Sequence, residues 1–153
     1  MSTIFGTSGD DYLLGSGIDS NIEGSSGNDT LAGGHGNDTL NGGLGNDQLY
    51  GGIGNDSLSA INYANAGGSD RLTGGSGSDI FQLDFAQGAN STNRIEVLDY
   101  STEDQILLSN NGGALDNAIS YNTISGEDKL SVIVDNDSNQ VLASIEGSEF
   151  FYL

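Results

Sequence analysis

A nine-residue period organises the first half of the chain and limits the folds open to it more than any other feature. The stretch GGHGNDTLNGGLGNDQLYGGIGNDSL, residues 33–58, shows the period most clearly. Each unit has three glycines, an aspartate at position six and one large apolar residue at position eight. One apolar residue cannot be buried within so short a unit, and each ordered glycine loses more backbone entropy than any other residue. The units must therefore stack, and something besides their own side chains must hold the stack together.

Eight frames follow this pattern, and they begin at Gly6, Gly15, Gly24, Gly33, Gly42, Gly51, Asn65 and Gly74. Position six holds Asp11, Ser20, Asp29, Asp38, Asp47, Asp56, Asp70 and Asp79. Three residues centred on position eight suit a very short strand with one side chain inward, and the glycine-rich remainder suits a tight turn. Two frames would then form one flattened coil, so that alternate frames lie on the same side.

This arrangement predicts two inner ladders of apolar side chains. One ladder contains Leu13, Leu31, Leu49 and Leu72, and the other contains Ile4, Ile22, Leu40, Leu58 and Phe81. We expect the five extra residues at 60–64 to bulge out as a loop, after which Asp70 rejoins the stack opposite Asp47. A disordered glycine–aspartate tract would need no apolar ladder, so the pattern favours a folded solenoid.

The same stacking brings carboxylates to about the 4.8 Å spacing of adjacent strands. Such carboxylates repel one another unless a cation lies between them. The chain has 22 acidic residues against 3 basic ones, a formal net charge of −19, and no cysteine. This charge excludes nucleic acid as a partner and leaves no thiolate metal site. Calcium takes six to eight oxygen ligands in flexible geometry, including the carbonyls that glycine turns expose, so the sequence predicts calcium sites in the turns.

The frames match G-G-x-G-x-D-x-U-x and resemble the repeats-in-toxin (RTX) family, a calcium-binding parallel β-helix. The resemblance covers residues 6–82. It implies calcium held between turns on the same side, in a chain that is disordered without the metal. The implied carboxylate ligands are Asp11, Asp29, Asp38, Asp47, Asp56, Asp70 and Asp79. The implied turn glycines are Gly6, Gly9, Gly24, Gly27, Gly33, Gly34, Gly36, Gly42, Gly43, Gly45, Gly51, Gly52, Gly54, Gly74, Gly75 and Gly77.

The second frame departs from the family pattern. Ile18 replaces a glycine and Ser20 replaces the aspartate, with Asp19 as a candidate substitute. The cage between this frame and Asp38 is therefore the weakest of those expected. We predict about four to six calcium ions in all.

From residue 83 onward the glycine period gives way to short strand patterns. The predicted strands are RIEVLDY (94–100), QILLS (105–109), AISYNTI (118–124), LSVIVD (130–135), VLASIEG (141–147) and EFFYL (149–153). We expect DNDSNQ to be a hairpin turn, and we expect an antiparallel β cap on the open end of the roll, packed through Phe81, Leu83 and Phe85. The fold class predicted is therefore all-β, with a parallel β-roll at 1–82 and this cap at 83–153.

The second half also resembles the C-terminal regions that follow RTX repeats, in GGSGSDIFQLDF, EVLDYSTEDQILLS and VLASIEG. That resemblance implies a C-terminal signal for the type I secretion machinery. The N-terminal MSTIFGTSGDD has no basic or apolar segment, so we expect no cleaved N-terminal signal and no membrane span. A calcium-free cytosol would keep such a chain unfolded for export, and extracellular calcium would fold it.

Other chemistry finds little support in the sequence. His35 stands alone, which gives neither a zinc site nor a catalytic triad. Asp135, Asp137, Asn139 and Glu146 have EF-hand spacing, but Gln140 stands where the loop requires glycine, so a hairpin is the better interpretation. We expect no enzyme, because no nucleophile lies beside a base and a narrow roll has no pocket.

Our first functional hypothesis is a secreted, monomeric, calcium-responsive folding module. The alternative is an extracellular glycan-binding module, since the layout resembles the accessory modules of alginate epimerases. With only Arg71, Arg94 and Lys129 as basic residues, it would take a neutral glycan, through Tyr12, Tyr50 or Tyr63. Ice binding is a third interpretation. It has a partial asparagine ladder (Asn28, Asn37, Asn46, Asn55), but Ser26, His35, Leu44 and Ile53 stand where threonines would be needed.

Overall fold

The computed structural model describes residues 1–62, 68–85, 94–110, 113–114, 130–135, 140–145 and 151–152. The strands in these residues are β1 (Ser2–Phe5), β2 (Tyr12–Leu14), β3 (Ser20–Glu23), β4 (Thr30–His35), β5 (Thr39–Asn41), β6 (Gln48–Ile53), β7 (Ser57–Asn62), β8 (Ser69–Ser76), β9 (Ile80–Phe85), β10 (Arg94–Val97), β11 (Gln105–Asn110), β12 (Gly113–Ala114), β13 (Leu130–Asp135), β14 (Gln140–Ile145) and β15 (Phe151–Tyr152). The described residues include no helix long and apolar enough to cross a membrane.

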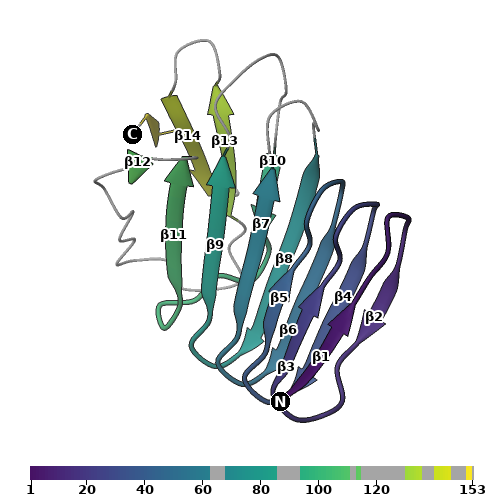
Figure 1. The fold of residues 1–153 in the computed structure, drawn as a ribbon. Helices are drawn as coiled ribbons and strands as arrows, with labels where there is room; N and C mark the ends of the chain where they lie inside the picture. The colour runs from purple at the N-terminus through teal and green to yellow at the C-terminus, as the bar shows by residue number, and fades with distance from the viewer. Residues whose placement is uncertain are drawn as a thin grey trace.

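The strands form two sheets, and from β1 to β11 they alternate between the two, as a two-sided coil requires. One sheet has the order β1-β3-β5-β7-β9-β11-β12, and the other has the order β15-β14-β13-β10-β8-β6-β4-β2. Figure 1 shows the coils stacked in chain order from the purple N-terminal end to the green strand β11. The pairs from β1 to β9 within each sheet are parallel, so the predicted parallel β-roll is confirmed.

Both predicted apolar ladders are present in the predicted register. Leu13 pairs with Leu31, Leu31 with Leu49 and Leu49 with Leu72 in one sheet. Ile4 pairs with Ile22, Ile22 with Leu40, Leu40 with Leu58 and Leu58 with Phe81 in the other. The side chains from Ile22 to Phe81 in these ladders are fully buried, and Ile4 and Leu13 pack against them at the N-terminal end. The core is therefore the thin layer between the two sheets.

The prediction of a bulge at 60–64 is wrong for its first three residues. Residues 60–62 extend β7 and pair with the end of β9, where Ala60 lies opposite Leu83. Both of these side chains are buried. Because side chains alternate along a strand, Ala60 faces inward like Leu58 two residues earlier. The insertion therefore widens the core, and residues 63–64 lie outside the described residues.

Two strands predicted for the antiparallel cap belong instead to the parallel stack. β10 pairs parallel with β8, and β11 pairs parallel with β9. Their inward residues Val97 and Ile106 lie opposite Leu72 and Phe81 and are buried, so each strand adds another step to an existing apolar ladder. The apolar ladders thus continue after the glycine repeats have ended.

Antiparallel pairing begins with β12 and β13. β13 pairs with both β10 and β14, and β14 pairs with β15. The predicted hairpin at DNDSNQ is confirmed by the pairing of Asp135 with Gln140. The cap joins the roll as an extension of one sheet, through the pairing of β10 with β13. The side chain of Phe85, through which we expected the cap to pack, lies outside the described residues. The predicted strand at 118–124 lies outside them as well.

Candidate metal sites

The position-six aspartates stand at the end of each turn, directly before the inward-facing strand. Asp29, Asp38, Asp47, Asp56, Asp70 and Asp79 are no more than 2% exposed. Asp11, in the first coil that the structure describes, is partly exposed. The turns thus place a file of buried carboxylates along each side of the roll, as predicted.

One oxygen of each buried carboxylate accepts a hydrogen bond from the preceding coil. The backbone N–H of Asp11 donates to Asp29 Oδ1 at 2.8 Å, and that of Asp29 donates to Asp47 Oδ1 at 2.8 Å. The bonds that repeat this pattern join Asp47 N to Asp70 Oδ1 (2.9 Å), Ser20 N to Asp38 Oδ1 (2.7 Å), Asp38 N to Asp56 Oδ1 (2.8 Å) and Asp56 N to Asp79 Oδ1 (2.8 Å). Each aspartate therefore fixes the register between two coils.

The second oxygen of four aspartates is buried and has no hydrogen-bond partner. These atoms are the Oδ2 oxygens of Asp29, Asp38, Asp56 and Asp79. An ionised carboxylate can only accept, and leaving a buried acceptor unsatisfied costs about 1–3 kcal/mol or more. Such a repeated cost indicates that a positively charged group belongs beside these oxygens.

The position-one glycine leaves the space for that group. A Cβ added at Gly24 would lie 2.6 Å from Asp29 Oδ2 and would also overlap the carbonyl oxygen of Gly42 in the next coil. The same relation joins Gly33, Asp38 and the carbonyl of Gly51, and it recurs at Gly51. Two oxygen acceptors therefore converge on a spot that no side chain fills. Carboxylate and carbonyl oxygens are the ligands that calcium prefers, so the residues fit a calcium ion.

The other turn glycines allow the coils to nest. Gly36, Gly45, Gly54 and Gly77 at position four have positive φ, as do Gly34, Gly43, Gly52 and Gly75 at position two. A Cβ at Gly45 would overlap the carbonyl of Gly27 in the preceding coil. Gly9 differs, since nothing lies within 4 Å of a Cβ there. It belongs to the first coil that the structure describes.

The buried aspartates of the turns have raised pKa values, so in the absence of a metal ion they bind protons more readily than exposed aspartates do. Burial raises the pKa of Asp47 to about 7 and that of Asp56 to about 6. Burial also raises the pKa values of Asp29, Asp38 and Asp79. Backbone hydrogen bonds from the adjacent coil oppose the rise, and the charges of neighbouring carboxylates add to it. A divalent cation between coils would remove both the repulsion and the need for these protons.

No three carboxylate or imidazole groups cluster as a ready metal site within the described ranges. The turns differ from such a site because carbonyl oxygens supplement carboxylates taken from successive coils.

Comparison with known protein families finds four copies of the RTX calcium-binding nonapeptide repeat, matching residues 2–17, 22–58 and 66–84. The chain belongs to the RTX calcium-binding nonapeptide repeat family. Its repeats bind calcium. A search of the curated proteins found no match to the chain.

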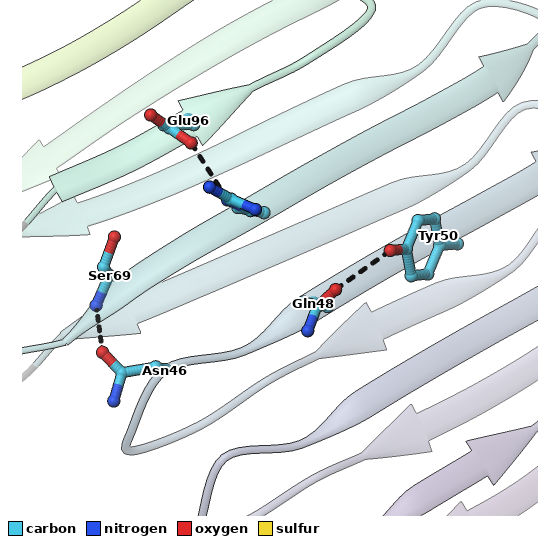
Figure 2. A network of polar contacts seen from close by, with 6 residues as sticks. Asn46, Gln48, Tyr50, Ser69 and Glu96 are labelled. Atoms are coloured by element: carbon cyan, nitrogen blue, oxygen red, sulfur yellow. Dashed lines mark hydrogen bonds and ion pairs between the residues drawn. The ribbon is translucent and has the colours of Figure 1, made fainter.

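Position five of the RTX repeats forms a second ladder that runs in the opposite direction. Asn46 N donates to Asn28 Oδ1 at 3.1 Å, and Ser69 N donates to Asn46 Oδ1 at 2.8 Å, as Figure 2 shows for the latter pair. Here the side chain accepts from the following coil, whereas position six accepts from the preceding one. The exposed ladder at position five and the buried ladder at position six together join each turn to both of its neighbours.

Asp19 belongs to this outer ladder, so the prediction that it partly substitutes for the missing aspartate is wrong. Asp19 is exposed, and its Oδ1 accepts the backbone N–H of Asn37 at 2.8 Å. Ser20 occupies the inner position instead. Its hydroxyl donates to the carbonyl of Ile18 at 2.8 Å and accepts from Ser2 Oγ at 3.0 Å. Hydrogen bonds within the protein therefore satisfy this turn, which has no carboxylate oxygen to offer a cation.

Asp104, which the nine-residue period did not predict, continues one file of carboxylates. Asp79 N donates to Asp104 Oδ1 at 2.8 Å, and Asp104 is 8% exposed. The signal was present in EDQIL, where Asp104 and Ile106 have the spacing of positions six and eight. The segment contains no glycine, so the nine-residue glycine pattern does not reach it. The other file ends at Asp70, because Ile95, buried and apolar, lies opposite it in β10.

Proposed function

We propose that this chain is a non-enzymatic module whose RTX repeats fold when they bind calcium, in a monomeric protein exported by type I secretion and acting outside the cell. The observation that carries the proposal is the set of buried Oδ2 oxygens without partners at Asp29, Asp38, Asp56 and Asp79. We infer about four to six ions, one between each pair of facing aspartate turns.

Three terms oppose folding without the metal. The chain carries a formal net charge of −19, with many of these charges in two buried files. Its 25 glycines lose the most backbone entropy on ordering. The core between the sheets is one layer of side chains. Calcium offsets the first term directly, and its binding free energy becomes folding free energy because the site does not exist in the unfolded chain.

The test is a calcium titration of the chelator-stripped chain, followed by far-ultraviolet circular dichroism, with magnesium as the control. We expect a cooperative transition from coil to β structure with calcium alone. Magnesium requires near-ideal octahedral geometry and keeps its waters, so a carbonyl-rich cage suits it poorly. A chain that is already β-rich without calcium would contradict the proposed trigger while leaving calcium binding itself intact.

Export needs its own experiment. The chain would be expressed with and without a type I exporter, in full length and without residues 149–153 (EFFYL). We expect the full chain in the medium only when the exporter is present, and retention of the shortened chain in the cells. Equal release of the two forms would remove the proposed C-terminal signal. Nothing in the described residues favours the glycan-binding or ice-binding alternatives.

A further inference from the structure

Residues 99–107 (DYSTEDQIL) form a ninth frame of the roll, although they contain no glycine and lie beyond the matched repeats. β11 follows Asp104 and pairs parallel with β9, which puts Ile106 opposite Phe81. Asp104 thus occupies position six, and its Oδ1 accepts the N–H of Asp79 at 2.8 Å. This bond is the same one that joins successive aspartates in the earlier coils.

Asp79 shows that this last step also lacks a positive charge. Its side chain is 1% exposed, and its Oδ2 has no hydrogen-bond partner. Gly74 lies directly beside this oxygen, because a Cβ added there would overlap Asp79 Oδ2. The same relation between a position-one glycine and an Oδ2 oxygen joins Gly33 to Asp38 and Gly51 to Asp56, where a carbonyl oxygen of the next coil also lies among the nearest atoms.

A second carboxylate takes the place of the position-one glycine in this frame. Asp99 Oδ1 accepts the N–H of Gly74 at 2.9 Å, and Asp99 Oδ2 accepts that of Gly75 at 2.7 Å. The like charges of Asp104 and Asp99 both act on Asp79. Among lysines and arginines, the structure describes the side chain of Arg71 alone. Arg71 does not supply the missing charge, because it is paired with Glu96 on the outer face of the sheet, at 3.1 Å (Figure 2).

We propose that Asp104 and Asp79 hold a further calcium ion, one coil beyond the glycine-rich repeats. A hard divalent cation fits because the converging groups are carboxylates that can only accept. The ion would extend the file that begins at Asp38, and it would join the last repeat to β11. Asp104 Oδ2 also accepts the N–H of Ser101 at 2.7 Å, and this bond holds the carboxylate in place before the metal arrives.

Calcium stoichiometry tests the proposal. Isothermal titration calorimetry would compare the full chain with Asp104→Asn, which keeps an oxygen to accept from Asp79 N but loses the charge. Asp10→Asn is the matched control, because Asp10 is exposed and its Oδ1 accepts from Asn28 N in the outer ladder. We expect Asp104→Asn to bind one calcium ion fewer and the control to bind the same number as the full chain. An unchanged number in folded Asp104→Asn would overturn the proposal.

Tyr100 supplies a second test that does not depend on the folding of Asp104→Asn. Tyr100 is buried, and its hydroxyl donates to the carbonyl oxygen of Asp104 at 3.3 Å. Terbium, which replaces calcium in oxygen cages, emits when a nearby tyrosine is excited. We expect Tyr100→Phe to lower this emission relative to Tyr50→Phe, since Tyr50 lies on the outer face and donates to Gln48 at 3.1 Å. Equal emission from the two variants would place no ion at Asp104.

The inference rests on calcium binding by the repeats, and the two can fail separately. If the proposed calcium-dependent folding is wrong but the repeats still bind, the stoichiometric comparison remains valid in the already folded chain. If the repeats bind no calcium, titration of the unmodified chain shows no heat of binding. If only the terminal site is absent, Asp104→Asn and the unmodified chain give the same stoichiometry.

Discussion

Asp38 donates its backbone N–H to Asp56 Oδ1 at 2.8 Å, while the other carboxylate oxygen of Asp56 lies buried without a partner. The two oxygens of one side chain therefore have separate roles. Oδ1 fixes the register of adjacent coils through a hydrogen bond that an amide oxygen could also accept. Oδ2 carries charge that the protein does not neutralise. This division allows the structural role and the metal-binding role to be tested independently.

Asp56→Asn should change stability in opposite directions with and without calcium. Without the metal, the variant removes a buried charge and its repulsion with Asp38 and Asp79, so a larger fraction of the chain should be folded. With the metal, the site has one charge fewer, and the calcium concentration at the folding midpoint should rise roughly tenfold. Circular dichroism along a calcium titration measures both effects.

The control for this variant is Asp10→Asn, which removes a carboxylate of the outer ladder. Asp10 is exposed, so its charge is screened by solvent and should matter little. If both variants raise the midpoint equally, general charge rather than the inner file controls folding. If Asp56→Asn destabilises the chain under both conditions, the separation of the two oxygens is wrong.

Acid should favour the metal-free roll and weaken calcium binding. Burial raises the pKa of Asp47 from 3.8 to about 7 and that of Asp56 to about 6. Because these folded-state pKa values lie above those of the unfolded chain, protonation stabilises the metal-free fold most at low pH. This contribution is lost as pH rises from about 4 to about 7. Calcium needs the deprotonated carboxylates, so its apparent affinity should fall over the same range as pH decreases.

The measurement compares metal-free chain, prepared by passage over a chelating resin, at pH values above and below this window. We expect more β structure at acidic pH without calcium, and a higher calcium midpoint at acidic pH with it. Asp47→Asn should reduce both pH effects, since that residue has the larger shift. A calcium midpoint that does not change with pH would show that these carboxylates are not the ligands.

The sequence predicted the roll well because its information is periodic. The spacing of Leu31, Leu40 and Leu49 determined which strands pair and in which register, and Asp38 and Asp47 could be placed from the same period. Asp104 could not be found this way, because its frame keeps the aspartate and the apolar residue but none of the glycines. The extension of β7 through Ala60 was not predicted from the period. Five residues added to a nine-residue repeat look like a loop when only the spacing is counted, although a longer strand can also hold some of them.

Gly54→Ala should destabilise the folded roll by about 2–4 kcal/mol, since left-handed backbone and overpacking each add to the cost. Gly54 has a φ of 142°, and an added Cβ would overlap the carbonyl oxygen of Gly36 in the preceding coil. Urea unfolding at saturating calcium measures the loss. Gly9→Ala, at the equivalent position of the first coil, is the matched control, because nothing lies within 4 Å of its Cβ. Equal losses for the two variants would contradict close nesting of the turns.

Ser20→Asp should create a calcium site where the file of carboxylates now ends. Ser20 is fully buried at position six, and its N–H already donates to Asp38 Oδ1 at 2.7 Å. A Cβ at Gly15 would overlap the carbonyl of Gly33 and lie 3.1 Å from Ser20 Oγ, so the position-one glycine leaves the same kind of space as at Gly33 and Gly51. The variant should bind one calcium ion more than the unmodified chain and be less folded without calcium, because it adds a buried charge. Ser20→Asn, with similar size and no charge, should show neither effect. If folded Ser20→Asp binds no additional calcium, then an aspartate beside an open glycine is not sufficient for a site, and Ile18 in place of the position-four glycine must block it.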